Sequence, residues 1–347
     1  MPTRTLGLAV LAVSVCATAG ADPQPAPKLE GNLDAHARLL APIQVESLTL
    51  LPIAAVDPPK APDNLLVLDE AMPKKLVAIK EVDGGSVNNL TLTNKADQPL
   101  FLLAGEVIIG GKQDRIIGSN TIIPARTTQT VPVFCVEHGR WTGSSSEFTT
   151  AKALAHGRLR GHASFDTQQD VWNEVAEKNA ERKTTSSSDT YRKVAQEQAD
   201  GSLGGKWEKQ IDSALAKLPD ADRKNLIGFA VALDGKVATI DRFNSPALFA
   251  KLQGKLVRSY ITEAVDVKST GKKPPSADDV KTFIADAEKA TSEPAYETAA
   301  ATGELKKGHF AAKAKVMYKP AAPTARTAGA PAPAATTTDV YETYQAR

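Results

Sequence analysis

The sequence predicts an α+β fold: an antiparallel, β-rich, sandwich-like core with a helical insertion and flanking helices. Three observations predict it. Short runs rich in Val, Ile, Leu and Thr recur between residues 43 and 137, separated by Gly, Asn and Pro. A charged, helix-forming stretch follows at about residues 144–220. Strand and helix patterns then continue to residue 318 without the regular strand–helix alternation of a doubly wound fold.

The strands of the first half are predicted from apolar runs that end at turn residues. One strand is expected at 43–53, before a group of prolines. Two more, at 76–82 and 87–93, flank Asp83-Gly84-Gly85 and form a hairpin, because glycine adopts the positive φ that such a turn needs. Further short strands are expected at 99–104, 106–109, 115–117, 121–123 and 130–137.

The second half combines helices with two hairpins. In the insertion, helices are predicted at 168–182, 189–199 and 205–218. A helix at 246–261 follows the N-cap Ser245 and a first-turn proline, and another at 277–289 follows the N-cap Ser276. Hairpins are expected at 226–233 with 236–243, around Asp234-Gly235, and at 296–302 with 310–319.

The first 21 residues have the pattern of a secretory signal peptide. Arg4 precedes a short apolar run, and Ala19-Gly20-Ala21 forms a small-residue cleavage site. The run is too short to cross a membrane as a permanent helix. The mature chain is therefore expected to begin near Asp22 and to be periplasmic or secreted, with Cys135 as its single cysteine.

The remaining chain divides by composition. Residues 22–40 are expected to be a linker and residues 41–318 a single domain. Residues 319–347 are rich in Ala, Pro and Thr and have no apolar period, so a disordered tail is predicted there.

Charge and motifs exclude several function classes. Lys and Arg number 42 against 40 Asp and Glu, a net charge of +2, so no basic field favours nucleic acid. No transmembrane helix is expected after signal cleavage. The chain has no P-loop and no dinucleotide-binding fingerprint, and Cys135-x-x-His138 lacks the second pair that a zinc site needs. We therefore predict neither a cofactor nor a metal.

The chemistry-bearing residues gather in two segments. In the first, Glu106 lies within an apolar run, and a Gly-Gly bend then presents Gln113, Asp114 and Arg115. In the second, the strand at 130–137 carries Glu137 towards the end of a buried face, and Arg140 and Trp141 follow. Because a buried carboxylate is costly without a partner, Arg115 and Arg140 are the expected partners of Glu106 and Glu137.

These segments support two interpretations. In one, Glu and Arg side chains form an internal network that stabilises the strands. In the other, a pocket for a small anionic ligand is lined by Glu106, Gln113, Asp114, Arg115, Glu137, Arg140 and Trp141. We predict a non-catalytic binding module. Two alternatives stay open: a hydrolase of an ADP-ribosyl or phosphorylated substrate that uses Glu106 and Glu137 as an acid/base pair, and an extracytoplasmic protein-interaction domain tethered by the tail.

Residues 66–141 resemble the ADP-ribosylglycohydrolase (ARG) and rhodanese-phosphatase-superfamily-associated protein domain family. The resemblance is carried by Leu68-Asp-Glu-Ala-Met72, Gly105-Glu106, Gly111-Lys-Gln-Asp-Arg115 and Cys135-Val-Glu-His-Gly-Arg-Trp141. Weaker similarity extends it over about 40–318. The family is named for gene neighbours that act on NAD derivatives and ADP-ribose, and it has no established activity. By association, the resemblance implies an ADP-ribose-like or nucleotide-like ligand, whereas the predicted export signal argues against a cytosolic role.

Overall fold

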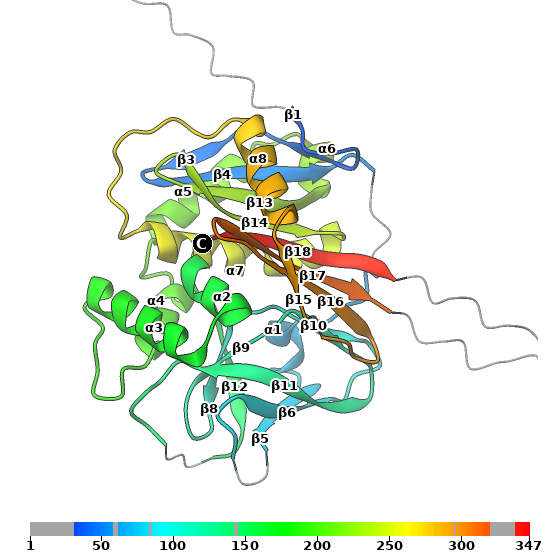
Figure 1. Ribbon diagram of the computed structural model, residues 1–347, viewed down its shortest axis with the longest axis vertical. Coiled ribbons are helices and arrows are strands. Elements are labelled where there is room, and N and C mark those ends of the chain that lie inside the picture. The colour runs from blue at the N-terminus through cyan, green and yellow to red at the C-terminus, as the bar shows by residue number, and fades with distance from the viewer. Residues whose placement is uncertain (1–30, 58–61, 83–84, 142–144, 295, 320–336) are drawn as a thin grey trace, which may run out of the picture.

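The computed structural model describes residues 31–57, 62–82, 85–141, 145–294, 296–319 and 337–347. The predicted signal peptide lies outside these residues, as do residues 22–30 of the predicted linker and residues 320–336 of the predicted tail. The described residues form antiparallel sheets with helices packed around them, which confirms the predicted α+β fold class (Figure 1).

A ten-stranded antiparallel sheet is the larger layer, with the order β1-β2-β4-β13-β14-β18-β17-β16-β15 and with β3 paired to β4. Its strands are β1 (Gly31–Asn32), β2 (Ala37–Leu39), β3 (Ile43–Val45), β4 (Leu48–Ala55), β13 (Leu226–Leu233), β14 (Lys236–Phe243), β15 (Thr291–Glu293), β16 (Ala301–Lys307), β17 (Ala311–Tyr318) and β18 (Thr338–Ala346). The predicted hairpin at 226–243 is confirmed at both of its strands.

A six-stranded sheet with the order β12-β8-β9-β11-β6-β5 forms a second, curled layer. A bridge between Lys80 and Glu147 brings its two outer strands together. Its strands are β5 (Val77–Glu81), β6 (Asn89–Asn94), β8 (Glu106–Gly110), β9 (Arg115–Ile117), β11 (Thr127–Cys135) and β12 (Phe148–Leu154). Close to it lie the pair β7 (Leu100–Leu102) and β10 (Thr121–Ile123) and the short helix α1 (Leu68–Ala71).

Two helices cover opposite faces of the large sheet. Helix α7 (Pro246–Ala264) packs on the side of Phe229 and Val231 of β13, whereas α8 (Ala277–Glu288) packs on the side of Ala230. Both begin at the predicted N-caps, since Ser245 and Ser276 each accept a backbone N–H of the first turn. The remaining helices are α2 (Gly157–Phe165), α3 (Gln168–Arg182), α4 (Arg192–Ala199), α5 (Gly205–Ala216) and α6 (Asp220–Lys224).

The prediction of a disordered tail is wrong for its last residues. Residues 338–346 form β18, which lies between β14 and β17 (Figure 1). The strand buries Val340, Tyr341 and Tyr344. The strand has no continuous apolar run, since most of its buried residues are tyrosines or polar. These side chains can be buried because they have partners on other strands and helices. The predicted linker is likewise wrong from residue 31 onward, where β1 and β2 join the edge of the large sheet.

Two predicted boundaries also differ from the structure. The helical insertion begins at Gly157 rather than near residue 144, because β12 (148–154) pairs with β8. The last predicted hairpin lies at 301–307 and 311–318, so its first strand starts later than expected. Among the described residues, none of the helices has both the length and the apolar character needed to span a membrane.

Candidate functional site

A Gly-Gly bend places the first predicted segment, as the sequence indicated. Gly110 and Gly111 have φ values of 138° and 51°, in the region that glycine adopts without a Cβ penalty. A Cβ on Gly111 would lie 2.3 Å from the ring of Phe148, so the bend also requires a close backbone approach. The turn directs Gln113 and Asp114 towards the end of β11.

Asp114 and Glu137 are held by arginines in a compact charged network. Arg140 donates to both carboxylate oxygens of Glu137 at 2.7–3.0 Å, as predicted. Arg192, which begins α4, donates to both oxygens of Asp114 at 2.6 and 2.8 Å. Burial acts to raise the pKa of Glu137, but hydrogen bonds from Arg140 and the Asp114 amide outweigh it and hold the pKa below its ordinary value.

Glu106 belongs to a different cluster. Its carboxylate accepts a hydrogen bond from the Lys255 ammonium of α7 at 2.8 Å, and Lys255 also lies 2.7 Å from Asp69 of α1. Burial acts to lower the pKa of Lys255, and the two carboxylates outweigh it and raise that pKa. The expected pairing of Glu106 with Arg115 is therefore wrong, because the cation comes from a helix 149 residues away.

Arg115 points into the interior of the curled sheet. It pairs across the strands with Cys135 and Ile108 and is fully buried. Its Nη1 contacts the Asp114 carbonyl at 3.4 Å, whereas Nε and Nη2 have no hydrogen-bond partner among the described residues. Burial also raises the pKa of the Cys135 thiol to about 11, so this cysteine is an inert core residue at neutral pH.

Gln113 and Trp141 complete the predicted set. The Gln113 amide donates to the Glu137 carbonyl at 2.7 Å and accepts from the Cys135 thiol. Trp141 is exposed and lies under the Lys112 ammonium. The structure thus brings together Gln113, Asp114, Glu137 and Arg140 and separates them from Glu106. The charged groups that it brings together are paired with one another.

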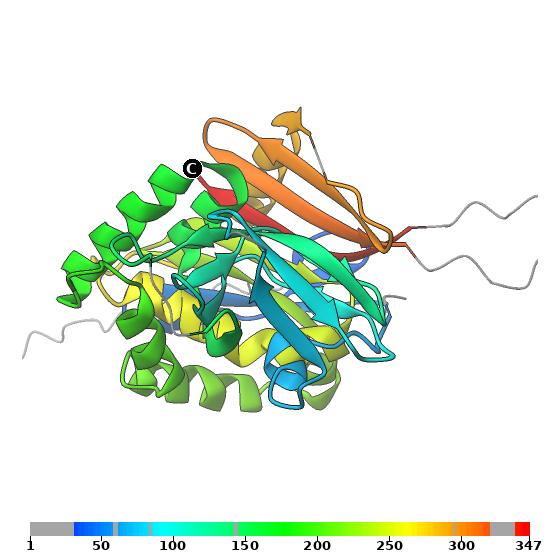
Figure 2. The same cartoon turned by 90° about the horizontal axis from the view of Figure 1, so that it is seen from below.

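A cleft of about 550 Å³ lies elsewhere, between α2 and the end of β18. The C-terminus lies beside α2 in both ribbon views (Figure 1; Figure 2). The cleft is lined by Gly157, Arg158, Gly161, His162, Asp166, Leu233, Ala238, Thr239, Glu263, Gly308, His309, Gln345, Ala346 and Arg347. None of the predicted site residues is in this lining, nor in that of the grooves beside α5 and beside the β16–β17 turn.

Three cationic or imidazole groups converge on Asp166 at one end of this cleft. Arg347 donates to both of its oxygens at 2.7 and 2.8 Å, and Lys307 lies 2.9 Å away. The Nδ1 of His162 lies 2.9 Å from the same carboxylate. Burial acts to raise the pKa of Asp166, but these partners lower it below its ordinary value. The Arg347 and Lys307 side chains therefore share the side-chain carboxylate of Asp166.

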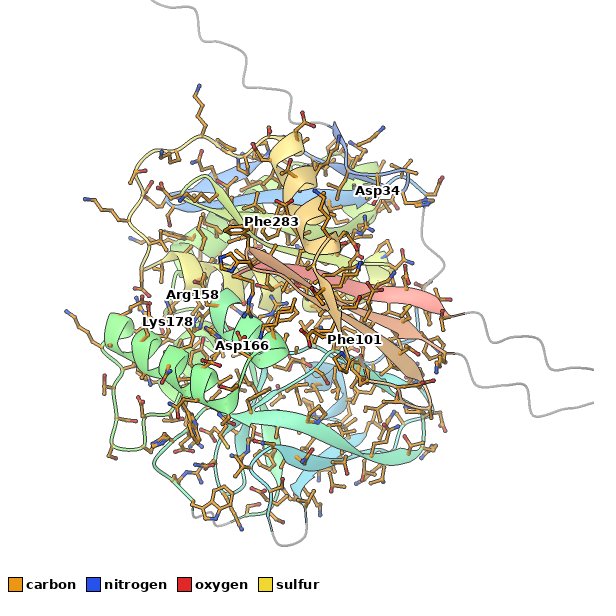
Figure 3. All side chains as sticks on the ribbon, in the orientation of Figure 1. Asp34, Phe101, Arg158, Asp166, Lys178 and Phe283 are labelled. Carbon is orange, nitrogen blue, oxygen red and sulfur yellow. The ribbon has the colours of Figure 1, made fainter. Side chains whose placement is uncertain are left out.

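The opposite end of the cleft is acidic. The Glu263 carboxylate accepts the backbone N–H of Arg158 at 2.9 Å, at the start of α2, and the Arg158 guanidinium at 3.0 Å. Glu174 and Glu177 surround the same guanidinium. Figure 3 labels Arg158 and Asp166 at α2, which borders the cleft, and Lys178 on the neighbouring helix α3. Among the described residues, no group of three His, Cys, Asp or Glu side chains is arranged to hold a metal ion.

Comparison with known proteins places the chain in a family. The family model of the ARG and Rhodanese-Phosphatase-superfamily-associated Protein domain, ARPP-1, matches residues 36–324. The chain belongs to this family. The predicted resemblance is thereby confirmed over nearly the whole described fold, although the match ends before β18. No match is found among curated proteins or among solved structures.

Sequence reasoning missed the cleft of this ARPP-1 domain. Its lining combines α2, the end of α7, the β13–β14 hairpin, the β16–β17 turn and the end of β18. The sequence contains one indication of the cleft, the spacing of His162 and Asp166. These residues are four positions apart, and an i,i+4 pair lies on one face of a helix. The acid/base pair of Glu106 and Glu137 stays a prediction, and equal turnover by wild type and Glu106→Gln would refute it.

Proposed function

We propose that this ARPP-1 domain is an exported binding module for a small anionic ligand, and that the ligand binds in the cleft between α2 and β18. The proposal moves the ligand away from the segments that the sequence singled out. It rests on the volume of the cleft and on the charges around Asp166. A third support is the mutual pairing of the charges in the Asp114–Glu137 network.

The cleft has the dimensions of a small-molecule site. Its volume of about 550 Å³ lies inside the range of roughly 300–1,000 Å³ that is usual for ligand pockets. Apolar Leu233 and Ala238 lie in the same lining as the polar groups of Thr239 and Gln345. A mainly apolar wall with a few polar groups is the usual composition of such sites.

The Asp166 end carries the proposal, because two cationic side chains meet at one carboxylate side chain there. Arg347 and Lys307 together bring two positive charges to one carboxylate. A guanidinium fork binds phosphate or carboxylate oxygens in a bidentate fashion. An incoming phosphate can therefore share Arg347 and Lys307 with Asp166. The acidic end at Glu263 then orients the ligand, because it repels the anionic group and favours a polar, uncharged part.

Thermal unfolding of the purified chain with inorganic phosphate, ADP-ribose, NAD and nucleotides tests this function. A ligand at 100 times its dissociation constant stabilises the native state by about 2.7 kcal/mol. We expect a saturable shift with at least one phosphate-bearing compound in wild type. The shift should be lost in Arg347→Ala, which removes the fork from the cleft.

Arg126→Ala is the matched control. Arg126 is an exposed arginine that also pairs with one aspartate, Asp97, but it does not line the cleft. A shift that persists in Arg347→Ala, or that disappears equally in both variants, contradicts the proposed site. No shift with any of the compounds contradicts the binding function itself.

Export is the second part of the proposal and rests on the signal-peptide pattern of residues 1–21. Expression with the native N-terminus in a bacterial host, fractionation, and mass measurement of the intact protein provide the test. We expect a mature chain that begins near Asp22 in the envelope or secreted fraction. A full-length chain that starts at Met1 in the cytoplasm contradicts export.

A further inference from the structure

Two exposed aromatic rings lie side by side on the turn between β16 and β17. Phe310 is 76% exposed, the highest value among the large apolar side chains that the structure describes. Its ring meets the ring of His309 edge to face, with 4.7 Å between the two ring centres. Single exposed apolar side chains are common on protein surfaces and need no function. An exposed pair of rings at the border of a cleft is a different feature, because a third ring can pack on it.

The turn itself does not depend on these rings. Its backbone closes through a hydrogen bond from the Gly308 N–H to the Ala311 carbonyl at 3.0 Å. The turn requires glycine at Gly308, because a Cβ there would lie 2.6 Å from the Ala311 carbonyl oxygen. His309 and Phe310 are not turn-forming residue types. The His309 side chain forms no hydrogen bond with the residues that the structure describes, so both rings are available to a ligand.

The ring pair borders the cleft of the proposed function. His309 lines both this cleft and the groove of about 540 Å³ beside the turn, and Phe310 lines that groove. At the start of the same turn, the Lys307 ammonium lies 2.9 Å from Asp166. The Arg347 N–H donates to the Phe310 carbonyl at 3.0 Å. The two rings are therefore neighbours of the two cations that hold the anionic group in the proposed function.

We propose that the ligand of the cleft is a phosphate ester that carries an aromatic ring, and that this ring packs on His309 and Phe310. The inference rests on the proposed function, because the phosphate is the anionic group held by Arg347 and Lys307. It adds a second contact to that function and restricts the class of ligand. The α2 wall of the cleft leaves space for a ring, since a Cβ on Gly161 would meet nothing within 4 Å among the described residues outside its own helix.

The contact selects for the presence of a ring rather than for its identity. Packing one aromatic ring against another buries apolar surface on both and adds a preference for stacked or edge-to-face geometry. Every base has a π face, so stacking on aromatic side chains tolerates different bases. We therefore expect a preference for ring-bearing phosphates over matched phosphates without a ring, and little preference among ring types.

Calorimetric titration of the purified chain with AMP and with ribose 5-phosphate tests this contact. The two compounds share a ribose and a 5′-phosphate, and only AMP has an adenine ring. We expect wild type to bind AMP at least about fivefold more tightly, the lower end of what stacking of a base on aromatic side chains contributes. In the double variant His309→Ala/Phe310→Ala, AMP affinity should fall to that of ribose 5-phosphate. The affinity for ribose 5-phosphate should not change, and both rings are exposed, so the double variant should unfold at the wild-type temperature.

Two further variants separate ring packing from other causes. His309→Phe keeps a ring and removes the imidazole nitrogens, so it should keep the preference for AMP. Loss of the preference in this variant would show that His309 acts through its nitrogens and would overturn the ring contact. Trp141→Ala is the matched control, because Trp141 is an exposed aromatic residue that lines neither the cleft nor the groove. Loss of the preference in Trp141→Ala would place the ring elsewhere and overturn the inference.

Ribose 5-phosphate distinguishes failure of this inference from failure of the proposed function. If wild type binds ribose 5-phosphate as tightly as AMP, and Arg347→Ala weakens both, the ring contact is overturned and the binding module stands. An equal preference for AMP in wild type and in the double variant also overturns the ring contact. If wild type binds neither compound, both proposals are overturned.

Discussion

The two charged regions of this molecule differ in how they are assembled. The Asp114–Glu137 network comes mostly from residues 113–140, and its carboxylates are matched by Arg140 and Arg192. The cleft at α2 draws on residues from 157 to 347, and two cations share the single carboxylate of Asp166. In the network each carboxylate has its own arginine, whereas in the cleft distant segments bring two cationic side chains to one carboxylate beside a hollow.

Removal of residues 337–347 is expected to have the largest effect. This change takes β18 out of the middle of the large sheet and separates β14 from β17. It also removes the Tyr341 hydroxyl, which hydrogen-bonds to the buried Asp241. We expect the truncated chain to lose cooperative thermal unfolding, as followed by circular dichroism. A truncated chain that unfolds at the wild-type temperature would show that β18 is a peripheral tail.

Asp241→Asn is expected to have the next largest effect. Asp241 is fully buried and accepts hydrogen bonds from Arg160, Tyr260 and Tyr341. The variant leaves a buried guanidinium without its charge partner, which costs about 3–5 kcal/mol of unfolding free energy. Chemical denaturation measures it, with Asp97→Asn as the control. Asp97 belongs to an exposed ion pair that solvent screens, so similar losses in the two variants would contradict the burial argument.

Asp114→Asn tests whether the charged network affects stability alone or also affects ligand binding in the cleft. Asp114 is fully buried, but its partners Arg140 and Arg192 are partly exposed, so a loss of about 2 kcal/mol in unfolding free energy is expected. Because the network is structural in this account, the phosphate-induced thermal shift should not change. If the variant is fully stable but no longer binds the ligand, the ligand site lies in the segment that the sequence predicted, and not in the cleft.

A smaller effect is expected from His156 as the pH falls. Burial lowers its pKa to about 3, so the unfolded chain binds a proton below about pH 6.5 that the native chain excludes. Stability is therefore lost as the pH falls, by about 1 kcal/mol between pH 7 and 5.5. Burial raises the pKa of Glu174, which acts in the opposite direction. Denaturation of His156→Gln at both pH values isolates the histidine, because this variant retains Glu174 and should lose less stability. An equal loss in both chains would contradict the assignment.

Local patterns predicted much of the fold. The hairpin at 226–243 follows from its turn and its apolar strands, and both N-caps, Ser245 and Ser276, satisfy the helix ends as expected. The Gly110-Gly111 bend and the pairing of Glu137 with Arg140 are also local, since they depend on residues a few positions apart.

The features that could not be predicted depend on contacts between distant residues. Lys255 meets Glu106 only after α7 packs against the curled sheet. Strand β18 was taken for a tail because its buried positions are tyrosine, threonine, glutamate and glutamine, whose partners lie on other elements. The cleft could not be predicted for the second of these reasons, since it requires the end of β18 beside α2. An apolar period along one segment contains no information about such partners.

Calorimetric titration of wild type, Arg347→Ala and Arg140→Ala with ADP-ribose and with inorganic phosphate tests the central claim most directly. Each variant removes one arginine that contacts a carboxylate, one in the cleft and one in the network. We expect Arg140→Ala to bind as wild type does and Arg347→Ala to lose at least tenfold in affinity. Binding that survives in Arg347→Ala and is lost in a folded Arg140→Ala would place the ligand in the network and contradict the cleft.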